Sequence, residues 1–481
     1  MLAEKQPLAE TQLLAQIPLL AEPIFDPELL NRFDISGPRY TSYPTAPQFS
    51  SKYDAASYRA AVQASNEDPI PRPLSIYVHI PYCFSPCFYC GCNRLITRDP
   101  LKGSVYLKHL DAELRMQGKL FDKDRSLVQL HYGGGTPNFL STEQLIELTA
   151  NIGRHFDLEV SDQREFSIEL DPRSTEPGLI EGLHAAGFNR ISLGVQDFDA
   201  KVQAAVNRVQ SVQETLAIMD DARRVGMRSI SIDLIYGLPK QTPTGFAATL
   251  DIVTTARPDR VAVYSYAHLP ERFRAQRRIS AEDLPDAATK LRLLELCVAK
   301  LGAAGYHYIG MDHFALPQDE LVRAQRSGNL QRNFQGYSTH ADCDLIGLGM
   351  SSIGKIGDFH HQNERELPAY VRALEEHRLP IARGIELDAD DLIRRDLIQH
   401  LMCDCRLDIV AFEHRHSLIF HQYFRAEMSR LAELAEAGLI ELTPRHISIT
   451  PRGRLLMRIV AMCFDRYLRT PSTVTQFSRV V

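Results

Sequence analysis

A short apolar run, Leu74-Ser-Ile-Tyr-Val-His-Ile80, leads directly into the segment Tyr82-Cys83-Phe-Ser-Pro-Cys87-Phe-Tyr-Cys90-Gly-Cys92. The run is rich in isoleucine and valine, which favour β-strands. Pro81 and Pro86 disfavour a helix through the cysteines. The sequence therefore predicts a buried strand that ends in a cysteine-bearing loop.

Further β-type runs follow this strand and alternate with helical segments, which is the sign of successive βα units. The six runs are residues 74–80, 127–132, 165–170, 190–195, 229–235 and 260–266. Two helices are predicted to begin between these runs, because Ser141 with Gln144 and Ser211 with Glu214 fit the capping-box pattern. Right-handed crossovers would curl six such units into part of a barrel. We expect an α/β fold: an open, partial (βα)6 barrel with a curved, mainly parallel sheet, plus a smaller, mostly helical C-terminal domain.

Three regions are predicted along the chain: an N-terminal extension and arm (1–72), a catalytic partial barrel (73–375) and a C-terminal domain (376–481). Asp388 is a plausible N-cap for a helix in the last region. Two short strands on either side of the turn at residues 443–446 are predicted to form a hairpin. Helices are predicted before and after this hairpin, an order that is similar to a winged helix. A helix is expected over residues 452–468.

Composition limits the possible partners. The chain has 481 residues, of which 44% are hydrophobic, and a net charge of -6. An acidic chain lacks the basic surface that nucleic-acid binding needs. Pro18, Glu22 and Pro23 interrupt the longest apolar stretch, so no membrane span is expected. The N-terminus has no secretory or mitochondrial leader pattern. We expect a cytoplasmic monomer.

The cysteine spacing predicts a metal centre. Nine cysteines are present and four lie between Cys83 and Cys92, an odd total that argues against a disulfide framework. Three thiolates at Cys-x3-Cys-x2-Cys can hold three corners of an iron–sulfur cubane and leave one iron open. A zinc site, or a cluster with Cys92 as fourth ligand, is the alternative, but the spacing fits neither pattern well. Cys92 follows Cys90 so closely that its thiol is expected to point away. The pair His360-His361 is expected to be exposed and offers no second metal site.

Polar residues follow the other strands. Gly133-Gly-Gly135-Thr136-Pro137 comes after the second run, and its glycines would let backbone amides approach a ligand. The later strand ends carry Glu169 and Asp171, Gln196 and Asp197, Asp233, and Ala267-His268. Ligands gather at the carboxyl ends of parallel strands, so we expect these residues to meet at one site.

This combination of motif and fold resembles the radical S-adenosylmethionine superfamily. The resemblance implies one [4Fe-4S] cluster held by Cys83, Cys87 and Cys90, with its open iron chelated by S-adenosylmethionine. It also implies that one electron from the cluster cleaves S-adenosylmethionine to methionine and a 5′-deoxyadenosyl radical, while the protein supplies position and shielding.

Within that superfamily the chain is similar to the family of oxygen-independent coproporphyrinogen III oxidases, from about Asn31 to the last residue. The matching segments are Ser36-Gly-Pro-Arg-Tyr-Thr-Ser-Tyr-Pro-Thr45, Tyr77-Val-His-Ile-Pro81, the cysteine cluster with Gly91-Cys92-Asn93, Gly133 to Pro137, Ile232-Asp-Leu-Ile-Tyr-Gly-Leu-Pro239, Gly310-Met-Asp-His-Phe314, Arg332-Asn-Phe-Gln-Gly-Tyr337 and Gln476-Phe-Ser-Arg479. The family's reaction converts two propionate groups of coproporphyrinogen III to vinyl groups by oxidative decarboxylation and gives protoporphyrinogen IX. An electron donor of unknown identity is implied.

The resemblance also implies two bound S-adenosylmethionine molecules. The one on the cluster would contact Tyr77, Gly134, Glu169 and Ile353, and the second would contact Tyr89, Gly135, Thr136, Gln196, Arg208, Asp233 and Ala267. The substrate has four carboxylates, so arginine clamps are expected, and Arg39 and Arg332 are the candidates.

Two other relatives of the superfamily are the competing interpretations. One is a chaperone that carries haem, and the other is a haem-degrading radical enzyme. Both are expected to lack a cysteine at the position of Cys92 and an arm like Gly37 to Pro44, and both features are present here.

Overall fold

The computed structural model describes residues 19–340, 343–469 and 477–480, so residues 1–18 of the predicted extension and Gln476 lie outside the described part. The chain forms two compact units. Unit 1 comprises described residues within 1–45, 291–341 and 388–481, and unit 2 comprises those within 46–290 and 342–387. The division predicted after residues 72 and 375 stays a prediction.

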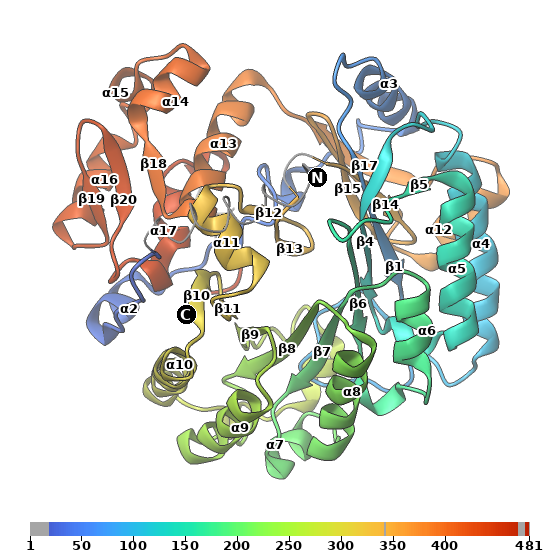
Figure 1. Ribbon diagram of the computed structural model, residues 1–481. Helices are drawn as coiled ribbons and strands as arrows, with labels where there is room; N and C mark the ends of the chain where they lie inside the picture. The colour runs from blue at the N-terminus through green and yellow to red at the C-terminus, as the bar shows by residue number, and fades with distance from the viewer. Residues whose placement is uncertain (1–18, 341–342, 470–476, 481) are drawn as a thin grey trace, which may run out of the picture. The chain divides into compact units, whose positions relative to one another are not determined.

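Unit 2 is built on a mainly parallel sheet, as predicted (Figure 1). Each of the six expected runs is a strand: β1 (Leu74–Ile80), β4 (Ser126–Gly134), β6 (Glu165–Leu170), β7 (Arg190–Gln196), β8 (Ser229–Tyr236) and β9 (Arg260–Ser265). Neighbouring strands pair in parallel in the order β1-β4-β6-β7-β8-β9. Their carboxyl ends therefore lie along one edge of the sheet.

Helices cover the outer face of this sheet (Figure 1). They are α3 (Ala55–Asn66), α4 (Leu101–Gln117), α5 (Thr142–His155), α6 (Leu179–Ala185), α7 (Ala200–Ala205), α8 (Val212–Val225), α9 (Pro243–Ala256) and α12 (Leu367–Glu375). The predicted capping boxes open α5 and α8, where Ser141 pairs with Gln144 and Ser211 with Glu214. These reciprocal bonds satisfy amides that the first turn leaves free.

The sheet extends beyond β1 with strands that the sequence did not predict. β14 (Asp344–Leu348) pairs with β1 in parallel, and β15 (Ile353–Ile356), β16 (Phe359–Asn363) and β17 (Ile381–Glu386) continue it antiparallel. The exposure expected for His360 and His361 is wrong, since they are 3% and 0% exposed. β16 lies between two other strands, and the ring of Tyr58 packs on His361 with centroids 4.6 Å apart.

Short strands complete the framework of unit 2. They are β2 (Tyr82–Cys83), β3 (Leu95–Ile96) and β5 (Asp157–Leu158). β2 and β3 pair in parallel, with Tyr82 opposite Leu95 and Cys83 opposite Ile96, so the intervening cysteine loop is tied at its base.

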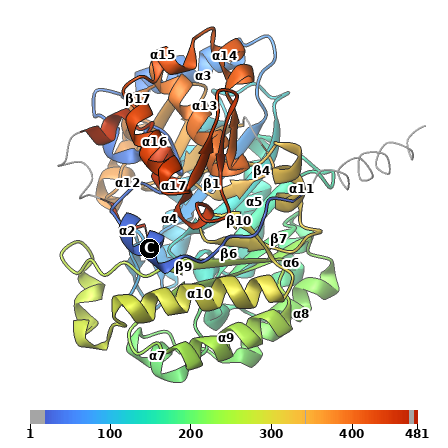
Figure 2. The same cartoon turned by 90° about the vertical axis from the view of Figure 1, so that its left-hand side faces the viewer.

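Unit 1 contains the largely helical C-terminal part, whose red and orange elements gather together in Figures 1 and 2. Its elements are α2 (Pro27–Phe33), most of α10 (Ala287–Ala303), β10 (His307–Gly310), β11 (His313–Ala315), α11 (Glu320–Ser327), β12 (Gln331–Asn333), β13 (Gly336–Ser338), α13 (Ala389–Asp404), β18 (Arg406–Asp408), α14 (Ile409–His416), α15 (Phe420–Tyr423), α16 (Met428–Glu436), β19 (Ile440–Leu442), β20 (His446–Ile449) and α17 (Met457–Met462). Asp388 caps α13, and β19 and β20 form the expected hairpin. The helix expected over residues 452–468 is shorter, because the α-helical part begins only at Met457.

The N-terminal arm packs within unit 1 against the end of the chain. Tyr40, 3% exposed, donates its hydroxyl to Asp465 at 3.0 Å, and the amide of Gly37 donates to the Ser478 carbonyl at 3.0 Å. Leu30 and Tyr43 are also buried. Segments more than 400 residues apart therefore share one core.

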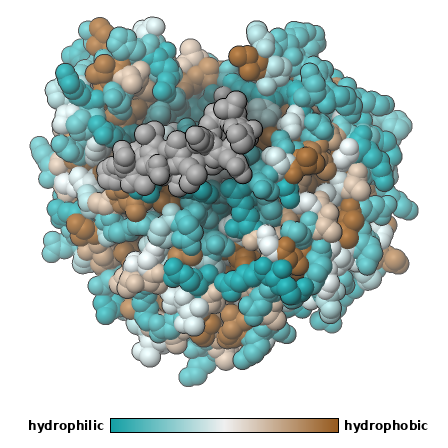
Figure 3. Space-filling view, in the orientation of Figure 1, coloured by the Kyte–Doolittle hydropathy of each residue, from teal (hydrophilic) through white to brown (hydrophobic). Residues whose placement is uncertain are grey.

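Hydrophilic residues dominate the face drawn in Figure 3, where apolar side chains form small separate groups. None of the helices in the described ranges is long and apolar enough to cross a bilayer.

Candidate active site

The carboxyl ends of the parallel strands surround a cavity of about 270 Å³ in unit 2. The strand register creates it: Glu169 lies opposite Ser192, and Gly194 lies opposite Asp233. Most of the predicted site residues line this cavity, namely Cys83, Cys87, Tyr89, Cys90, Gly134, Gly135, Thr136, Glu169, Gln196, Arg208 and Asp233. The structure thus brings together residues that are up to 150 positions apart in sequence.

The cysteine loop forms one wall of the cavity. Cys83 and Cys87 are 8% and 7% exposed, and Cys90 is partly buried. Thr136 donates its hydroxyl to the Cys83 sulfur at 3.2 Å. The Cys90 amide donates to the Cys87 carbonyl at 3.3 Å, and Arg94 donates to the same carbonyl at 3.0 Å. These bonds fix the loop so that all three sulfurs lie at one cavity.

Cys92 does not turn away from the site, contrary to expectation. It also lines the cavity, and its backbone amide donates to the Cys90 sulfur at 3.4 Å. Such amide–sulfur bonds adjust the charge on a cluster thiolate. Four cysteines, Cys83, Cys87, Cys90 and Cys92, therefore line the cavity.

The donor set fits an iron–sulfur cluster. Thiolates are the usual ligands of such clusters, and each thiolate of a cubane binds a different iron. Across residues 19–340, 343–469 and 477–480, no three His, Cys, Asp or Glu side chains converge on a point that could hold a single metal ion. Three cysteine sulfurs carried by one loop are a donor set that an iron–sulfur cluster can use.

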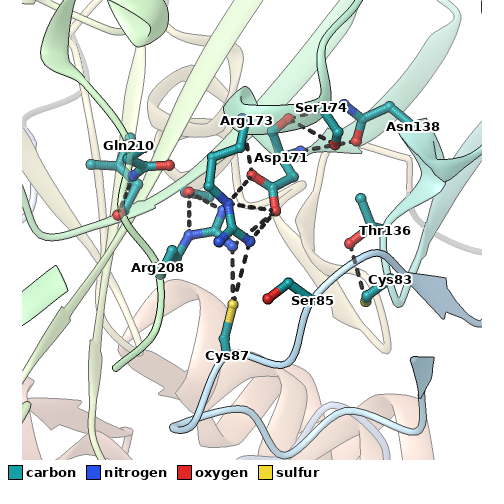
Figure 4. Close-up of polar contacts among 12 residues, drawn as sticks. Cys83, Ser85, Cys87, Thr136, Asn138, Asp171, Arg173, Ser174, Arg208 and Gln210 are labelled. Atoms are coloured by element: carbon teal, nitrogen blue, oxygen red, sulfur yellow. Dashed lines mark hydrogen bonds and ion pairs between the residues drawn. The ribbon is translucent and has the colours of Figure 1, made fainter. Parts of the chain in front are cut away.

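Asp171 joins the charged groups beside the cysteines (Figure 4). Its carboxylate accepts from Arg173 at 2.6 Å and from Arg208 at 3.1 Å. Arg208 also donates to the Cys87 sulfur at 3.4 Å, and Arg173 approaches that sulfur at 3.6 Å. Burial alone would raise the pKa of Asp171, but hydrogen bonds and charge from the two guanidinium groups lower it below its usual value. The network places positive charge next to the Cys87 sulfur.

Arg173 is a site residue that sequence reasoning missed. Arg94, Leu170, Ser192, Gly194 and Tyr264 line the cavity as well and were not predicted. For Arg173 a signal was available, because it follows Asp171 and Pro172 immediately after β6. An arginine two residues beyond a strand-end aspartate can turn back to pair with it.

Gln196 enters the site through an irregular backbone. Its φ is +69°, a conformation that is costly for residues other than glycine, and the β7–β8 register shifts between Gly194 and Gln196. A Cβ on Gly194 would lie 3.0 Å from both the Arg208 Nη2 and the Gln196 Nε2. Glycine at 194 therefore makes room for both polar side chains, and strain of this kind clusters at functional sites.

Asp233 supplies a carboxyl group that can exchange a proton near neutrality. It accepts from the Ser192 hydroxyl at 3.1 Å. Burial, and then the negative charge of Glu169, raise the pKa of Asp233 to about 7. Such a group can either donate or accept a hydrogen bond to a sugar hydroxyl.

Three further predicted residues, Tyr77, Gly134 and Glu169, are connected through His131 and through direct contacts. The Tyr77 ring stacks on His131 with centroids 5.8 Å apart, and His131 contacts Glu169 at 3.3 Å. The Gly134 amide donates to Glu169 at 3.4 Å, and Gly134 has φ +112°. A Cβ at Gly134 would lie 2.6 Å from the His79 ring, so only glycine fits this turn.

Tyr77, Ile353 and Ala267 do not line the cavity. Tyr77 lies opposite Gly347 in the β1–β14 strand pair. A Cβ on Gly347 would lie 3.0 Å from the Ile353 carbonyl oxygen, so Tyr77 and Ile353 lie near each other. Ala267 is tied to the cysteine loop, because Gln276 donates to the carbonyls of Tyr89 at 2.9 Å and of Ala267 at 3.2 Å.

The two candidate substrate clamps lie in unit 1. Arg39 pairs with Asp312 at 2.6 Å. Arg332 is 7% exposed, packs 4.7 Å from the centroid of the Tyr337 ring, and donates through Nε to the Arg39 carbonyl at 3.3 Å. Its Nη1 is buried and makes no hydrogen bond within the described part of the chain. A buried guanidinium nitrogen in this state is suited to an incoming carboxylate.

Known proteins resemble this chain in sequence and fold. Residues 77–253 match the model of the Radical SAM superfamily, and residues 387–456 match the HemN C-terminal domain. The chain is 48% identical to the oxygen-independent coproporphyrinogen III oxidase of Salmonella typhimurium, over 95% of this chain and 98% of that one. It is also 48% identical to the enzyme of the same name from Pseudomonas aeruginosa, over 95% and 99%. The chain belongs to the oxygen-independent coproporphyrinogen III oxidase family.

A solved structure supports the same assignment. The Escherichia coli coproporphyrinogen III oxidase, described as a radical SAM enzyme, matches with a TM-score of 0.88 at 45% identity and covers 93% of this chain and 100% of that chain. The predicted fold class and superfamily are thereby confirmed. Superfamily membership brings with it a [4Fe-4S] cluster and S-adenosylmethionine.

Proposed function

We propose that this chain converts two propionate groups of coproporphyrinogen III to vinyl groups without oxygen and so forms protoporphyrinogen IX. The observation that carries the proposal is the cavity at the strand ends, where three loop cysteines lie beside recognition groups for a nucleotide. The full-length similarity to enzymes named for this reaction supports it. The presence of Cys92 and of the Gly37 to Pro44 arm disfavours the haem-carrier and haem-degrading alternatives.

Cys83, Cys87 and Cys90 would hold the cluster, and Arg208 and Arg173 would donate hydrogen bonds to the Cys87 sulfur. When bound, the cluster and S-adenosylmethionine would supply one electron and the radical that takes a hydrogen atom from the substrate propionate; the propionate would then lose carbon dioxide and pass one electron to a separate electron acceptor. The role of the protein is to hold these reactants in place and to exclude water.

We assign Tyr77, Gly134, Glu169 and Ile353 to the S-adenosylmethionine on the cluster. The Glu169 carboxylate, which the Gly134 amide holds in place, would accept a hydrogen bond from the amino group of S-adenosylmethionine. The aromatic face of Tyr77, stacked on His131, is rigid and sits on the adjoining strand.

A second S-adenosylmethionine is proposed at Tyr89, Gly135, Thr136, Gln196, Arg208, Asp233 and Ala267. The charge of Arg208 suits a carboxylate, and Asp233 suits ribose hydroxyls. Gln276 donates to the backbone carbonyls of both Tyr89 and Ala267, which would hold these two residues in a fixed arrangement on one side of the bound molecule.

Arg39 and Arg332 are proposed to bind propionate carboxylates of the substrate. Both residues are held in place in unit 1, and the buried Nη1 of Arg332 leaves one donor available. Because the loop cysteines Cys83, Cys87, Cys90 and Cys92 are free thiols, we place the reaction in a reducing compartment, the cytoplasm.

The test is turnover under anaerobic conditions. Reconstituted, chemically reduced protein with S-adenosylmethionine and coproporphyrinogen III should yield protoporphyrinogen, methionine and 5′-deoxyadenosine. A protein that instead binds haem without turnover, or that opens the haem ring, would contradict the proposal and favour one of the two alternatives.

A further inference from the structure

His131 is a polar residue of unit 2 to which no role has been assigned. It lies in β4, opposite Tyr77 of β1 and Ser167 of β6. Glu169 follows Ser167 by two residues on β6, so both side chains point to the same face of the sheet. Because Glu169 lines the main cavity, this row of side chains lies on the cavity side of the sheet.

The His131 ring contacts two of the residues assigned to the S-adenosylmethionine on the cluster. The ring planes of His131 and Tyr77 differ by 14°, which is a stacked arrangement. The Nε2 of His131 lies 3.3 Å from the Oε1 of Glu169, and the Gly134 amide donates to Oε2 at 3.4 Å. Each oxygen of the Glu169 carboxylate is therefore held by one donor, and each keeps a lone pair for a ligand.

The hydrogen bonds of His131 determine which ring nitrogen carries the proton. An ionised carboxylate only accepts hydrogen bonds, so Nε2 donates to Glu169. Nδ1 lies 2.6 Å from the Ser167 hydroxyl oxygen. In a neutral ring Nδ1 is then the acceptor and the Ser167 hydroxyl is the donor. Ser167 therefore fixes the ring orientation in which Nε2 faces Glu169.

Glu169 is ionised at neutral pH because of this contact. Loss of water around the carboxylate would raise the pKa of Glu169. The hydrogen bond from His131 is the largest of the effects that lower this pKa below its usual value. Ionised Glu169 can accept a hydrogen bond from an amino group of the ligand.

The neighbouring backbone leaves room for the contact between His131 and Glu169. A Cβ on Gly133 would lie 3.1 Å from the His131 Nε2 and 3.1 Å from the Glu169 Oε1. A side chain at position 133 would crowd the point at which these two groups meet. Both hydrogen bonds described for the His131 ring go to side chains, and one of these lines the cavity. A histidine that only tied strands together would instead bond to the backbone.

We propose that His131 is a positioning residue for the S-adenosylmethionine on the cluster. It holds the Glu169 carboxylate in the orientation that the ligand requires and fixes the plane of the Tyr77 ring. The proposal rests on the proposed function, which assigns Glu169 and Tyr77 to this ligand. A group that is oriented before binding loses less conformational freedom when the ligand arrives, so the contribution of His131 is to affinity.

Three substitutions separate the hydrogen bonds from the stacked ring. His131→Phe keeps an aromatic ring beside Tyr77 but cannot donate to Glu169. His131→Gln loses the ring but keeps an amide nitrogen that can donate. Ser167→Ala removes the hydroxyl that fixes the ring orientation. His109→Gln, on α4 at the outer face of the sheet, is the matched control.

The measurement is an anaerobic titration with S-adenosylmethionine, followed by electron paramagnetic resonance of the reduced cluster in frozen samples. This signal reports the molecule on the cluster. The concentration at half of the spectral change should rise about tenfold to a hundredfold in His131→Phe, the size expected for one hydrogen bond to a charged group. It should rise about threefold to tenfold in Ser167→Ala and about fivefold or less in His131→Gln.

The iron content and the urea midpoint of His131→Phe should stay close to those of the wild type and of His109→Gln. Equal half-change concentrations in His131→Phe and the wild type would overturn the proposal. Should His131→Phe fail to fold, an unchanged concentration in Ser167→Ala would overturn it instead. A wild type that binds S-adenosylmethionine but leaves coproporphyrinogen III unreacted would contradict the proposed function and not the role of His131.

Discussion

The negative charge of Asp171 compensates the positive charges of two arginines at the site. Asp171 is the shared partner of Arg173 and Arg208, and its side chain is only 11% exposed. Removal of one member of a buried charge network leaves the others without compensation, which is costlier than loss of a surface pair. Sequence reasoning placed Asp171 at a strand end but could not give its partners, because pairing depends on how Arg173 and Arg208 turn.

Asp171→Asn should therefore destabilise the protein by about 3 kcal/mol. The midpoint of urea denaturation measures this change. Asp221→Asn is the control, because its pair with Arg224 is exposed to solvent and should contribute little to stability. Equal midpoint shifts for the two variants would contradict the role of Asp171.

Arg332 gives a second prediction at this scale. Arg332→Gln removes the charge but keeps a polar group, so KM for coproporphyrinogen III should rise about tenfold to a hundredfold, as expected for one charge-assisted hydrogen bond. KM for S-adenosylmethionine should stay unchanged. Arg378→Gln, at a side chain 60% exposed, is the control. An unaltered substrate KM in Arg332→Gln would remove Arg332 from the substrate site.

At the scale of elements, the regular βα units were predictable and the sheet extension was not. β1, β4 and β6 to β9 are apolar runs with helical partners, so periodicity alone indicates them. β14 to β17 are short, and β16 contains Phe359-His-His-Gln-Asn363, which is polar yet buried. Its burial comes from pairing and from the cover of Tyr58, neither of which is visible in the local sequence.

Glu113 joins α4 to the sheet extension. It is fully buried and accepts from Tyr370 at 2.6 Å, from Asn363 at 2.6 Å and from the Gly349 amide at 2.8 Å. Gly349 directly follows β14, in the turn that leads to Ile353 at the start of β15. Burial raises the pKa of Glu113 to about 7, and the three donors offset this only in part.

This shift sets a pH dependence of stability. From about pH 4.5 to about pH 7 the unfolded chain has lost the Glu113 proton and the folded chain has kept it, so stability falls as pH rises. Below that window both states are protonated, and above it both are ionised. The expected loss across the window is about 3 kcal/mol.

Glu113→Gln should flatten this part of the profile, as measured by urea denaturation from pH 4 to pH 8. Glu147→Gln, at an exposed position of α5, should keep the wild-type slope. A Glu113→Gln profile parallel to the wild type would show that Glu113 does not titrate in this window.

On the scale of the whole molecule, unit 1 is assembled from three separated chain segments. The arm contributes Leu29, Leu30, Phe33, Tyr40 and Tyr43 to its buried residues. The sequence showed the arm only as an extended segment, because its partners near residues 451–479 are more than 400 positions away.

Deletion of residues 1–45 should therefore unfold unit 1 at a lower temperature. Each buried side chain of this size is worth about 1.5–3 kcal/mol, so the loss of five is severe. Calorimetry should find an early transition, and the truncated chain should bind more of a hydrophobic dye. A single transition at the wild-type temperature would contradict the packing described for the arm.

The central claim is that three loop thiolates hold a cluster with one iron left for S-adenosylmethionine. Anaerobic electron paramagnetic resonance of the reduced protein, with and without S-adenosylmethionine, tests it most directly. The account predicts a [4Fe-4S] signal that changes when S-adenosylmethionine is added, in the wild type and in Cys92→Ser alike, and no such signal in Cys87→Ser. A signal that ignores S-adenosylmethionine, or that disappears in Cys92→Ser, would contradict it.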